Sequence, residues 1–191
     1  MTKKILVLNA NPKTSSYSKH LSDFYEIEAR EYFEIKRFDV SAMGFNPSLD
    51  CGYDGQQDLE PSLLEFQNAI VWADHLVMVT PIWWGGLPAK LKGLFERTFL
   101  PGFSFQFESG SPLPVPLLKG KTSRVIITMD TPEEHASEEA AAVIAQLDQY
   151  TLQFCGFEKA EIHLFAPIIS ATPEEKQAWE ERIKAVAAKG E

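Results

Sequence analysis

Two adjacent tryptophans followed by two glycines are the most distinctive short stretch of the sequence. Residues 80–88 read TPIWWGGLP and come directly after an apolar run. Trp83 and Trp84 cannot both point into a core behind that run, so at least one should face a planar ligand or a partner subunit. The glycines would let the backbone approach such a ligand closely. Simple packing at a dimer interface is the alternative.

A second stretch suits the binding of a phosphate group. Residues 9–18 read NANPKTSSYS and lead from an apolar run into a helical pattern. Free backbone N–H groups at the start of a helix, surrounded by hydroxyls, form an anion site. The stretch contains neither GxGxxG nor GxxxxGK, so a dinucleotide fingerprint and a P-loop are both absent. Ordinary capping of the helix by serine or threonine is the alternative.

A third candidate stretch, residues 128–135, reads TMDTPEEH. Its backbone amides and hydroxyls could bind the polar edge of a ring. The Asp130 carboxylate would repel an anionic ring, so we expect that side chain to turn away. His135 is the one histidine in a candidate site loop, because His20 falls in a helical pattern and His75 and His163 fall in strands. A surface role for His135 is the alternative.

The elements that must position these stretches alternate along the whole chain. Strand-like apolar runs followed by helix-period segments are typical of an α/β protein with a parallel sheet. The sequence predicts strands at 5–8, 33–40, 75–79, 124–129 and 160–165, the second at an edge of the sheet. It predicts helices at 18–30, from Pro61, at 88–97, at 137–154 and after Thr172.

Five such units without a break in composition predict a single doubly wound domain over residues 1–191. Ligands bind such domains beyond the carboxyl ends of the strands, at the topological switch point. The loops after the first, third and fourth strands should therefore meet there. Residues 41–60 form an unusually long loop, which is typically functional or poorly ordered.

Composition narrows the class of protein. The chain has 191 residues, a formal net charge of −9, 45% hydrophobic and 24% charged residues, as ordinary globular proteins do. The acidic balance argues against binding to nucleic acid or to anionic membranes. The two cysteines lack metal-type spacing, so we expect no disulfide scaffold and no metal site. Without a long apolar stretch, we expect no membrane insertion and a cytoplasmic location.

The sequence resembles a known family. Residues 81–97 (PIWWGGLPAKLKGLFER) resemble the signature of the flavodoxin-like NAD(P)H:quinone oxidoreductases, and residues 11–18, 103–107 and 154–157 support the likeness. The resemblance implies a flavodoxin-like five-stranded parallel sheet of order 2-1-3-4-5 with helices on both faces. It also implies a homodimer that binds FMN or FAD, with Trp83, Trp84 and residues 103–107 near the shared site.

The resemblance assigns the flavin to the three candidate loops and implies no metal. Residues near the phosphate and ribityl chain would be Asn11, Ser15, Ser16, Tyr17 and Ser18. Residues along the ring would be Pro81, Ile82, Trp83, Trp84 and Gly85, and those at its pyrimidine edge Thr128, Met129, Asp130 and Thr131.

The implied reaction is ping-pong: NAD(P)H delivers hydride to flavin N5 and leaves, and a quinone or related acceptor then takes the electrons. His135 is a candidate proton donor to the reduced acceptor. The chain departs from the family where Thr128-Met129-Asp130-Thr131 replaces the frequent Thr-Thr-Gly-Gly. The Tyr and His that assist hydride transfer in the mammalian enzymes also have no clear counterpart.

Two other functions stay open: a flavodoxin-type electron carrier, and an ancillary regulatory subunit of a potassium efflux system. The sequence does not choose between FMN and FAD or between NADH and NADPH. Residues 90–124 carry six basic and two acidic side chains. They could favour an anionic nicotinamide nucleotide beside the flavin, or they could simply be solvated surface residues.

Overall fold

Five parallel strands form the central sheet of the computed structural model, which describes residues 2–191. The strand order is β2-β1-β3-β6-β7, and every pairing in this sheet is parallel. The predicted flavodoxin-like order 2-1-3-4-5 is therefore confirmed, with β2 at an edge. The strands are β1 (Lys4–Asn9), β2 (Glu34–Asp39), β3 (His75–Pro81), β6 (Thr122–Thr128) and β7 (Glu161–Phe165).

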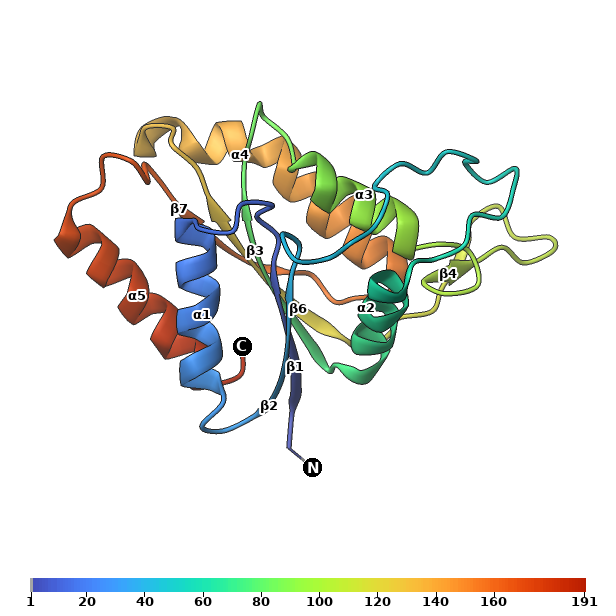
Figure 1. Cartoon of the computed structure of the whole chain (residues 1–191), viewed down its shortest axis with the longest axis horizontal. Helices are drawn as coiled ribbons and strands as arrows, with labels where there is room; N and C mark the ends of the chain where they lie inside the picture. The colour runs from blue at the N-terminus through green and yellow to red at the C-terminus, as the bar shows by residue number, and fades with distance from the viewer. Residues whose placement is uncertain (1) are drawn as a thin grey trace.

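Helices cover both faces of the sheet (Figure 1). Alternate residues of β1 feed two separate cores, because successive side chains of a strand point to opposite faces. Ile5 and Val7 pack with α1 and α5, whereas Leu6 and Leu8 pack with α2, α3 and α4. The helices are α1 (Tyr17–Ala29), α2 (Pro61–Trp72), α3 (Ala89–Thr98), α4 (Glu133–Leu147) and α5 (Pro173–Ala187).

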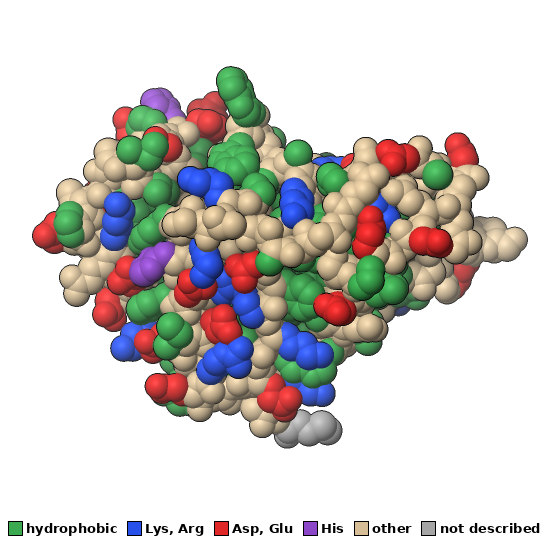
Figure 2. Space-filling view, viewed as in Figure 1, with side chains coloured by type: hydrophobic (Ala, Val, Ile, Leu, Met, Phe, Trp, Pro, Cys, Tyr) green, Lys and Arg blue, Asp and Glu red, His purple; other side chains and the backbone are tan. Residues whose placement is uncertain are grey.

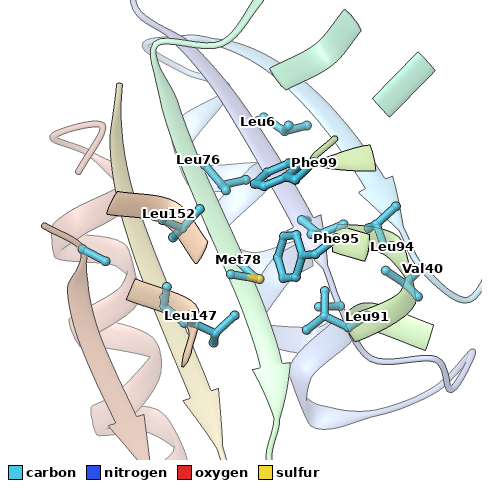
Figure 3. Packing of buried hydrophobic residues seen from close by; sticks show 14 of the residues in the cluster. Leu6, Val40, Leu76, Met78, Leu91, Leu94, Phe95, Phe99, Leu147 and Leu152 are labelled. Carbon is cyan, nitrogen blue, oxygen red and sulfur yellow. The ribbon is translucent and has the colours of Figure 1, made fainter. Parts of the chain in front are cut away.

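Phe95 of α3 and Phe99, the residue that directly follows this helix, anchor it on the sheet. Figure 3 shows Phe95 beside Met78 and Phe99 beside Leu76, and both of these partners belong to β3. All four side chains are buried in the same core. The loop that carries the two tryptophans joins β3 to α3. Because α3 is packed on β3, the two elements that flank this loop are held together.

Local signals explain where the helices begin. The Ser16 side chain accepts the N–H of Lys19 and caps α1. Thr172 and Glu175 form a reciprocal capping box at the start of α5, as a threonine, a proline and two acids in order predict. Pro132 precedes α4, whose first turn holds Glu133 and Glu134. Acidic residues are favourable there because they face the positive end of the helix dipole.

The helix predicted at 137–154 differs from α4 at both ends. It begins four residues earlier, at Glu133, and continues as a π-helix over Asp148–Gln153. Gly156 follows with φ 109°, as expected of the glycine placed there. A small hairpin of β4 (Phe105–Gln106) and β5 (Val115–Pro116) was not predicted, because strands of two residues carry no periodicity.

Residues 41–60 form the expected long loop, and α3 holds it in place. Lys90 Nζ donates to the carbonyl of Met43 over 2.7 Å. Arg97, only 1% exposed, donates to the carbonyls of Asn46 and Asp58 over 2.6 and 2.7 Å. A Cβ on Gly93 would lie 2.4 Å from the carbonyl oxygen of Pro47, so only glycine lets the loop approach this closely. The loop is therefore fastened along one face of α3.

Cys155 is buried and Cys51 exposed, and neither forms a disulfide within residues 2–191. The same residues include no group of three or more His, Cys, Asp and Glu side chains arranged to hold a metal ion. None of the helices described combines the length and the apolar character needed to cross a membrane.

Candidate functional site

A groove of about 240 Å³ lies at the carboxyl edge of the sheet, where β1 and β3 end. The helices that follow these neighbouring strands, α1 and α3, pack on opposite faces of the sheet, so the groove occupies the topological switch point. Four loops of the chain line it. The lining residues are Asn11, Lys13, Ser16, Tyr17, Ser18, Pro81, Ile82, Trp83, Thr128, Met129, Asp130, Ile168 and Ile169.

One end of the groove is built to hold an anion. The Ser16 hydroxyl takes the N–H of Lys19 over 3.1 Å, whereas the N–H groups of Tyr17 and Ser18 have no acceptor within residues 2–191. They lie in the first turn of α1, at the positive end of the helix dipole. Lys13 adds a positive charge to the lining. A phosphate group would therefore meet a cation, free backbone donors and hydroxyls.

The floor of the groove is a chain of buried hydrogen bonds. Ser18 Oγ lies 2.9 Å from Thr128 Oγ1 and accepts from Asn11 Nδ2 over 3.3 Å. Asn9 Oδ1 in turn accepts the N–H of Asn11 over 3.3 Å. Ser18 and Thr128 are 2% and 5% exposed. Their hydroxyls thus join the end of β1, the start of α1 and the end of β6 rather than extending into the groove.

The other end of the groove is apolar. Pro81, Ile82 and Trp83 come from β3 and the loop after it, and Ile168 and Ile169 from the β7–α5 loop. These five side chains form walls suited to a planar ring.

The Asp130 carboxylate lies at this end and is turned to the backbone. Its Oδ1 accepts the N–H of Ile169 over 2.8 Å, in line with the expectation that it would not face a ring. This bond ties the β6–α4 loop to the β7–α5 loop across the groove.

Trp84 occupies a tight turn with an unusual backbone. Trp83 and Gly86 exchange two backbone hydrogen bonds of 3.0 Å, and φ is 54° at Trp84 and 66° at Gly85. Positive φ at both central residues defines a type I′ turn, which normally prefers asparagine or glycine. The turn presents Trp84 entirely to solvent. The turn between β3 and α3 projects at the top of Figure 1. Hydrophobic side chains protrude at the same place in Figure 2.

The family described as having a flavodoxin-like fold matches residues 3–189 of the sequence. The chain belongs to this family. The match spans all five strands of the sheet and all four loops of the groove.

Curated relatives carry the names of oxidoreductases. An uncharacterized NAD(P)H oxidoreductase of Haemophilus influenzae is 30% identical over 137 residues, which cover 68% of this chain and 66% of that protein, just under two thirds. The human ribosyldihydronicotinamide dehydrogenase [quinone] is 25% identical, over 96% of this chain and 92% of that protein. These names confirm the resemblance to quinone oxidoreductases drawn from the sequence.

Solved structures share the fold. The NAD(P)H:quinone oxidoreductase of Methanothermobacter marburgensis superimposes with a TM-score of 0.80 at 19% identity and covers both chains completely. An FMN-dependent NADH-azoreductase of Bacillus anthracis, solved in complex with FMN, superimposes with a TM-score of 0.72 at 20% identity, over 98% of each chain.

The flavodoxin-like fold brings most of the predicted site residues together. Ten of them line the groove: Asn11, Ser16, Tyr17, Ser18, Pro81, Ile82, Trp83, Thr128, Met129 and Asp130. Ser15, Trp84, Gly85 and Thr131 do not line it. The Thr131 hydroxyl instead donates to Glu139 Oε2 over 2.7 Å, within the start of α4.

Three lining residues were missed. Lys13 sits inside the predicted phosphate loop but had no role assigned to it. Ile168 and Ile169 belong to the loop after the last strand, whereas the switch-point rule draws attention only to the loops after the first, third and fourth strands. An apolar pair in a loop at the same edge of the sheet was the available signal.

His135 lies in the first turn of α4, outside the groove lining. Its side chain is exposed, and its ring makes no hydrogen bond to any residue from 2 to 191. The imidazole is therefore free to meet a molecule that approaches from solvent.

Tyr17 lines the groove, and its hydroxyl is neutral and turned to α5. Burial, assisted by the nearby Glu180 carboxylate, raises the pKa of Tyr17 to about 12. The ring stacks on His20 with 5.5 Å between centroids. At neutral pH the hydroxyl keeps its proton and donates it to the carbonyl of Lys176 over 3.5 Å, at the start of α5.

Four of the six basic side chains of residues 90–124 are held by partners within the protein. Lys90 and Arg97 hold the 41–60 loop, and Lys92 pairs with Glu96 on the same helix. Lys121 donates to backbone carbonyls. Partners within the protein already hold these four side chains, and the hypothesis that the stretch attracts a nicotinamide nucleotide stays a prediction.

Proposed function

We propose that the chain is a flavin-dependent NAD(P)H:quinone oxidoreductase. The coarser assignment, an oxidoreductase resembling the quinone reductases, is confirmed by the names of its relatives. The observation that carries the finer proposal is the groove itself, which joins an anion-binding helix start to an apolar cleft at the switch point.

The groove residues fit FMN. Lys13, the hydroxyl of Ser16 and the free N–H groups of Tyr17 and Ser18 would hold its phosphate, and Trp83 and Ile169 would line its ring. One phosphate-binding loop favours FMN over FAD, which carries a second phosphate. A bound flavin supplies two-electron chemistry, accepting hydride from NAD(P)H and returning electrons to an acceptor.

The chain's own residues would position the rings and exclude water. The apolar lining consists of Pro81, Ile82, Trp83, Met129, Ile168 and Ile169, and Tyr17 adds a ring whose hydroxyl bonds to the Lys176 carbonyl. We propose a ping-pong order, because a single groove would oblige NAD(P)H and the quinone to use the same opening in turn. The free imidazole of His135 is our candidate for the proton given to the reduced acceptor.

We further propose that the chain works as a homodimer. Large apolar side chains are exposed around α3 and its neighbours: Trp84 fully, Phe107 at 74%, Tyr53 at 72% and Tyr150 at 69%. Exposed aromatic surface of this kind marks interaction sites. Pairing of two identical surfaces would cover it in both copies.

The test is a purified protein assayed alone. Bound flavin should be released by denaturation and identified as FMN, and the protein should sustain oxidation of NADH or NADPH with menadione as acceptor. A protein that is colourless and also fails to bind added FMN or FAD would contradict the proposal. A protein that binds FMN but needs a separate reductase would instead be an electron carrier.

A further inference from the structure

A second cavity lies at the amino edge of the sheet, on the far side from the flavin groove. Its volume is about 460 Å³. Arg124 lines it and lies four residues before Thr128 on β6, on the order of 13 Å away along the strand. The cavity is lined by Lys3, His75, Thr122, Ser123, Arg124, Glu158, Lys159, Glu161 and Glu191.

Arg124 is a buried cation with no carboxylate in direct contact, although Glu161 and Glu191 act on it from further away. Its exposure is 5%, and no carboxylate oxygen within residues 2–191 comes within 4.0 Å of its guanidinium. Its Nη1 instead contacts His163 Nε2, a ring nitrogen. A buried charge is costly when nothing neutralises it, so this position calls for an anion.

Buried polar atoms without a partner occur on the strands around Arg124, although Ser123, its neighbour in β6, points to the other face of the sheet. Seven buried side-chain atoms among the described residues lack a partner, and four of them are His75 Nε2, Ser123 Oγ, Arg124 Nε and His163 Nδ1. Because Arg124 donates to His163 Nε2, the proton of that imidazole must be on Nδ1. Arg124 Nε and His163 Nδ1 are thus two buried donors that have no acceptor within the described residues.

Both histidines are neutral at ordinary pH. Burial, with Lys3 and Arg124 nearby, lowers the pKa of His75 to about 3. Burial, with Arg124 and Arg182 nearby, lowers the pKa of His163 to about 4. Neither ring adds a charge to the cavity, so Arg124 is its dominant buried charge.

The remaining charges lie at the rim. Glu158, Lys159, Glu161 and Glu191 are exposed. Glu161 lies opposite Arg124 in the strand register. Lys3 is half-buried and donates to the carbonyl of Gly190 over 2.6 Å. Solvated carboxylates at a rim compete weakly with an anion that reaches the buried guanidinium directly.

We propose that this cavity binds a small organic anion through a phosphate or carboxylate group, with Arg124 as the principal contact and Lys3 beside it. A volume of 460 Å³ equals about fifteen waters at roughly 30 Å³ each, so a group larger than an inorganic ion can be accommodated. A planar guanidinium fork is suited to either head group.

The test uses the full chain saturated with FMN, so that added anions do not occupy the flavin groove. Inorganic phosphate and succinate, the two head-group chemistries, are titrated separately while sodium chloride keeps the ionic strength constant. The Arg124 Nε–H signal is followed by ¹⁵N NMR, with the Arg97 Nε–H as an internal reference, and Tm is recorded in parallel.

We expect one of the two anions to shift the Arg124 signal saturably, raise Tm and leave the Arg97 signal unchanged. Arg124→Met should raise the apparent Kd at least tenfold, whereas Lys13→Ala, in the flavin groove, should not. The proposal is overturned when neither anion shifts the Arg124 signal saturably at concentrations up to about 50 mM, because binding weaker than this would not be useful. An anion that raises the Tm of Arg124→Met as much as that of the native protein also overturns it. Should that variant not fold, the NMR titration of the native protein decides.

Discussion

Ser18 Oγ and Thr128 Oγ1 lie 2.9 Å apart beneath the groove, although 110 residues separate them in the chain. Ser18 belongs to the first turn of α1 and Thr128 ends β6, so the contact joins the proposed phosphate end to the wall formed by the next strand. Both side chains are buried. These two hydroxyls therefore set the relative position of two loops that would share one flavin.

Thr128→Val tests that role, because valine keeps the shape of threonine and removes the hydroxyl. The free energy of unfolding should fall by about 1–2 kcal/mol, since Ser18 loses a buried partner. FMN should also bind several-fold more weakly, as measured by fluorescence titration. Thr131→Val is the control: its hydroxyl bonds to Glu139 outside the groove lining, and the change should cost about 0.5 kcal/mol or less. Equal effects of the two variants would contradict this role.

The sequence predicted the fold well where a hydrophobic pattern extends over many residues. All five strands of the sheet and all five helices were expected, because apolar runs and capping signals such as Thr172 and Glu175 are local. The β4–β5 hairpin and the π-helical end of α4 were not, since the first is too short for a pattern and the second depends on packing.

A second prediction concerns the long loop. Arg97→Met should release residues 41–60 from α3, because the buried guanidinium holds the carbonyls of Asn46 and Asp58 and pairs with Glu60 at 2.9 Å. The free energy of unfolding should fall by about 3 kcal/mol, measured by urea denaturation. Limited proteolysis should then cut within residues 41–60.

Lys92→Met is the matched control on the same helix. Lys92 forms an exposed ion pair with Glu96, and its loss should cost under about 1 kcal/mol and leave the loop resistant to protease. Rapid cleavage in both variants, or in neither, would show that Arg97 does not hold the loop.

The site was predicted less completely than the fold. Contiguous loops at the switch point supplied ten of the lining residues, but Ile168 and Ile169 enter through a loop that only tertiary packing brings to the groove. Sequence also could not show that Lys90 and Arg97 would be occupied by the 41–60 loop. Side-chain partners far along the chain are set by the fold, so a count of charges in a segment does not predict a free patch.

Trp84→Asn should stabilise the protein and impair its activity. Trp84 holds φ 54°, which costs most residues about 1 kcal/mol, whereas asparagine is favoured at this position of a type I′ turn. Tm should therefore rise when native protein and variant are compared as dissociated monomers at low concentration. Quinone turnover and dimer formation should both fall, because the exposed indole is lost.

Trp84→Phe is the companion variant, since it keeps both the strained backbone and an aromatic ring. Its Tm should stay near that of the native protein and its turnover should be largely retained. A rise in Tm for both variants would show that the backbone conformation is not the source of the strain.

A fourth prediction concerns acid stability. An unfolded chain protonates His75 near pH 6.5, whereas burial keeps its pKa at about 3 in the folded protein. The unfolded state thus binds more protons between these values, and the free energy of unfolding should fall as pH drops from 6.5 towards 3. His75→Asn should flatten this dependence while an amide replaces ring Nδ1 as the partner of the Thr122 hydroxyl. Urea denaturation at pH 7 and 4.5 measures it, and the exposed His135→Asn should leave the dependence unchanged.

The last prediction separates the proton donor from the flavin site. His135→Ala removes an exposed imidazole that lies outside the groove lining, so FMN should bind as tightly as before. If His135 protonates the reduced acceptor, the oxidation of bound flavin by menadione should slow while its reduction by NAD(P)H keeps its rate. Stopped-flow spectroscopy measures the two half-reactions separately. His135→Gln is the control for shape, because it retains a polar side chain but cannot deliver a proton, and it should be as slow as the alanine variant. Unchanged rates in both variants would assign the proton to water, which the open side of the groove can supply.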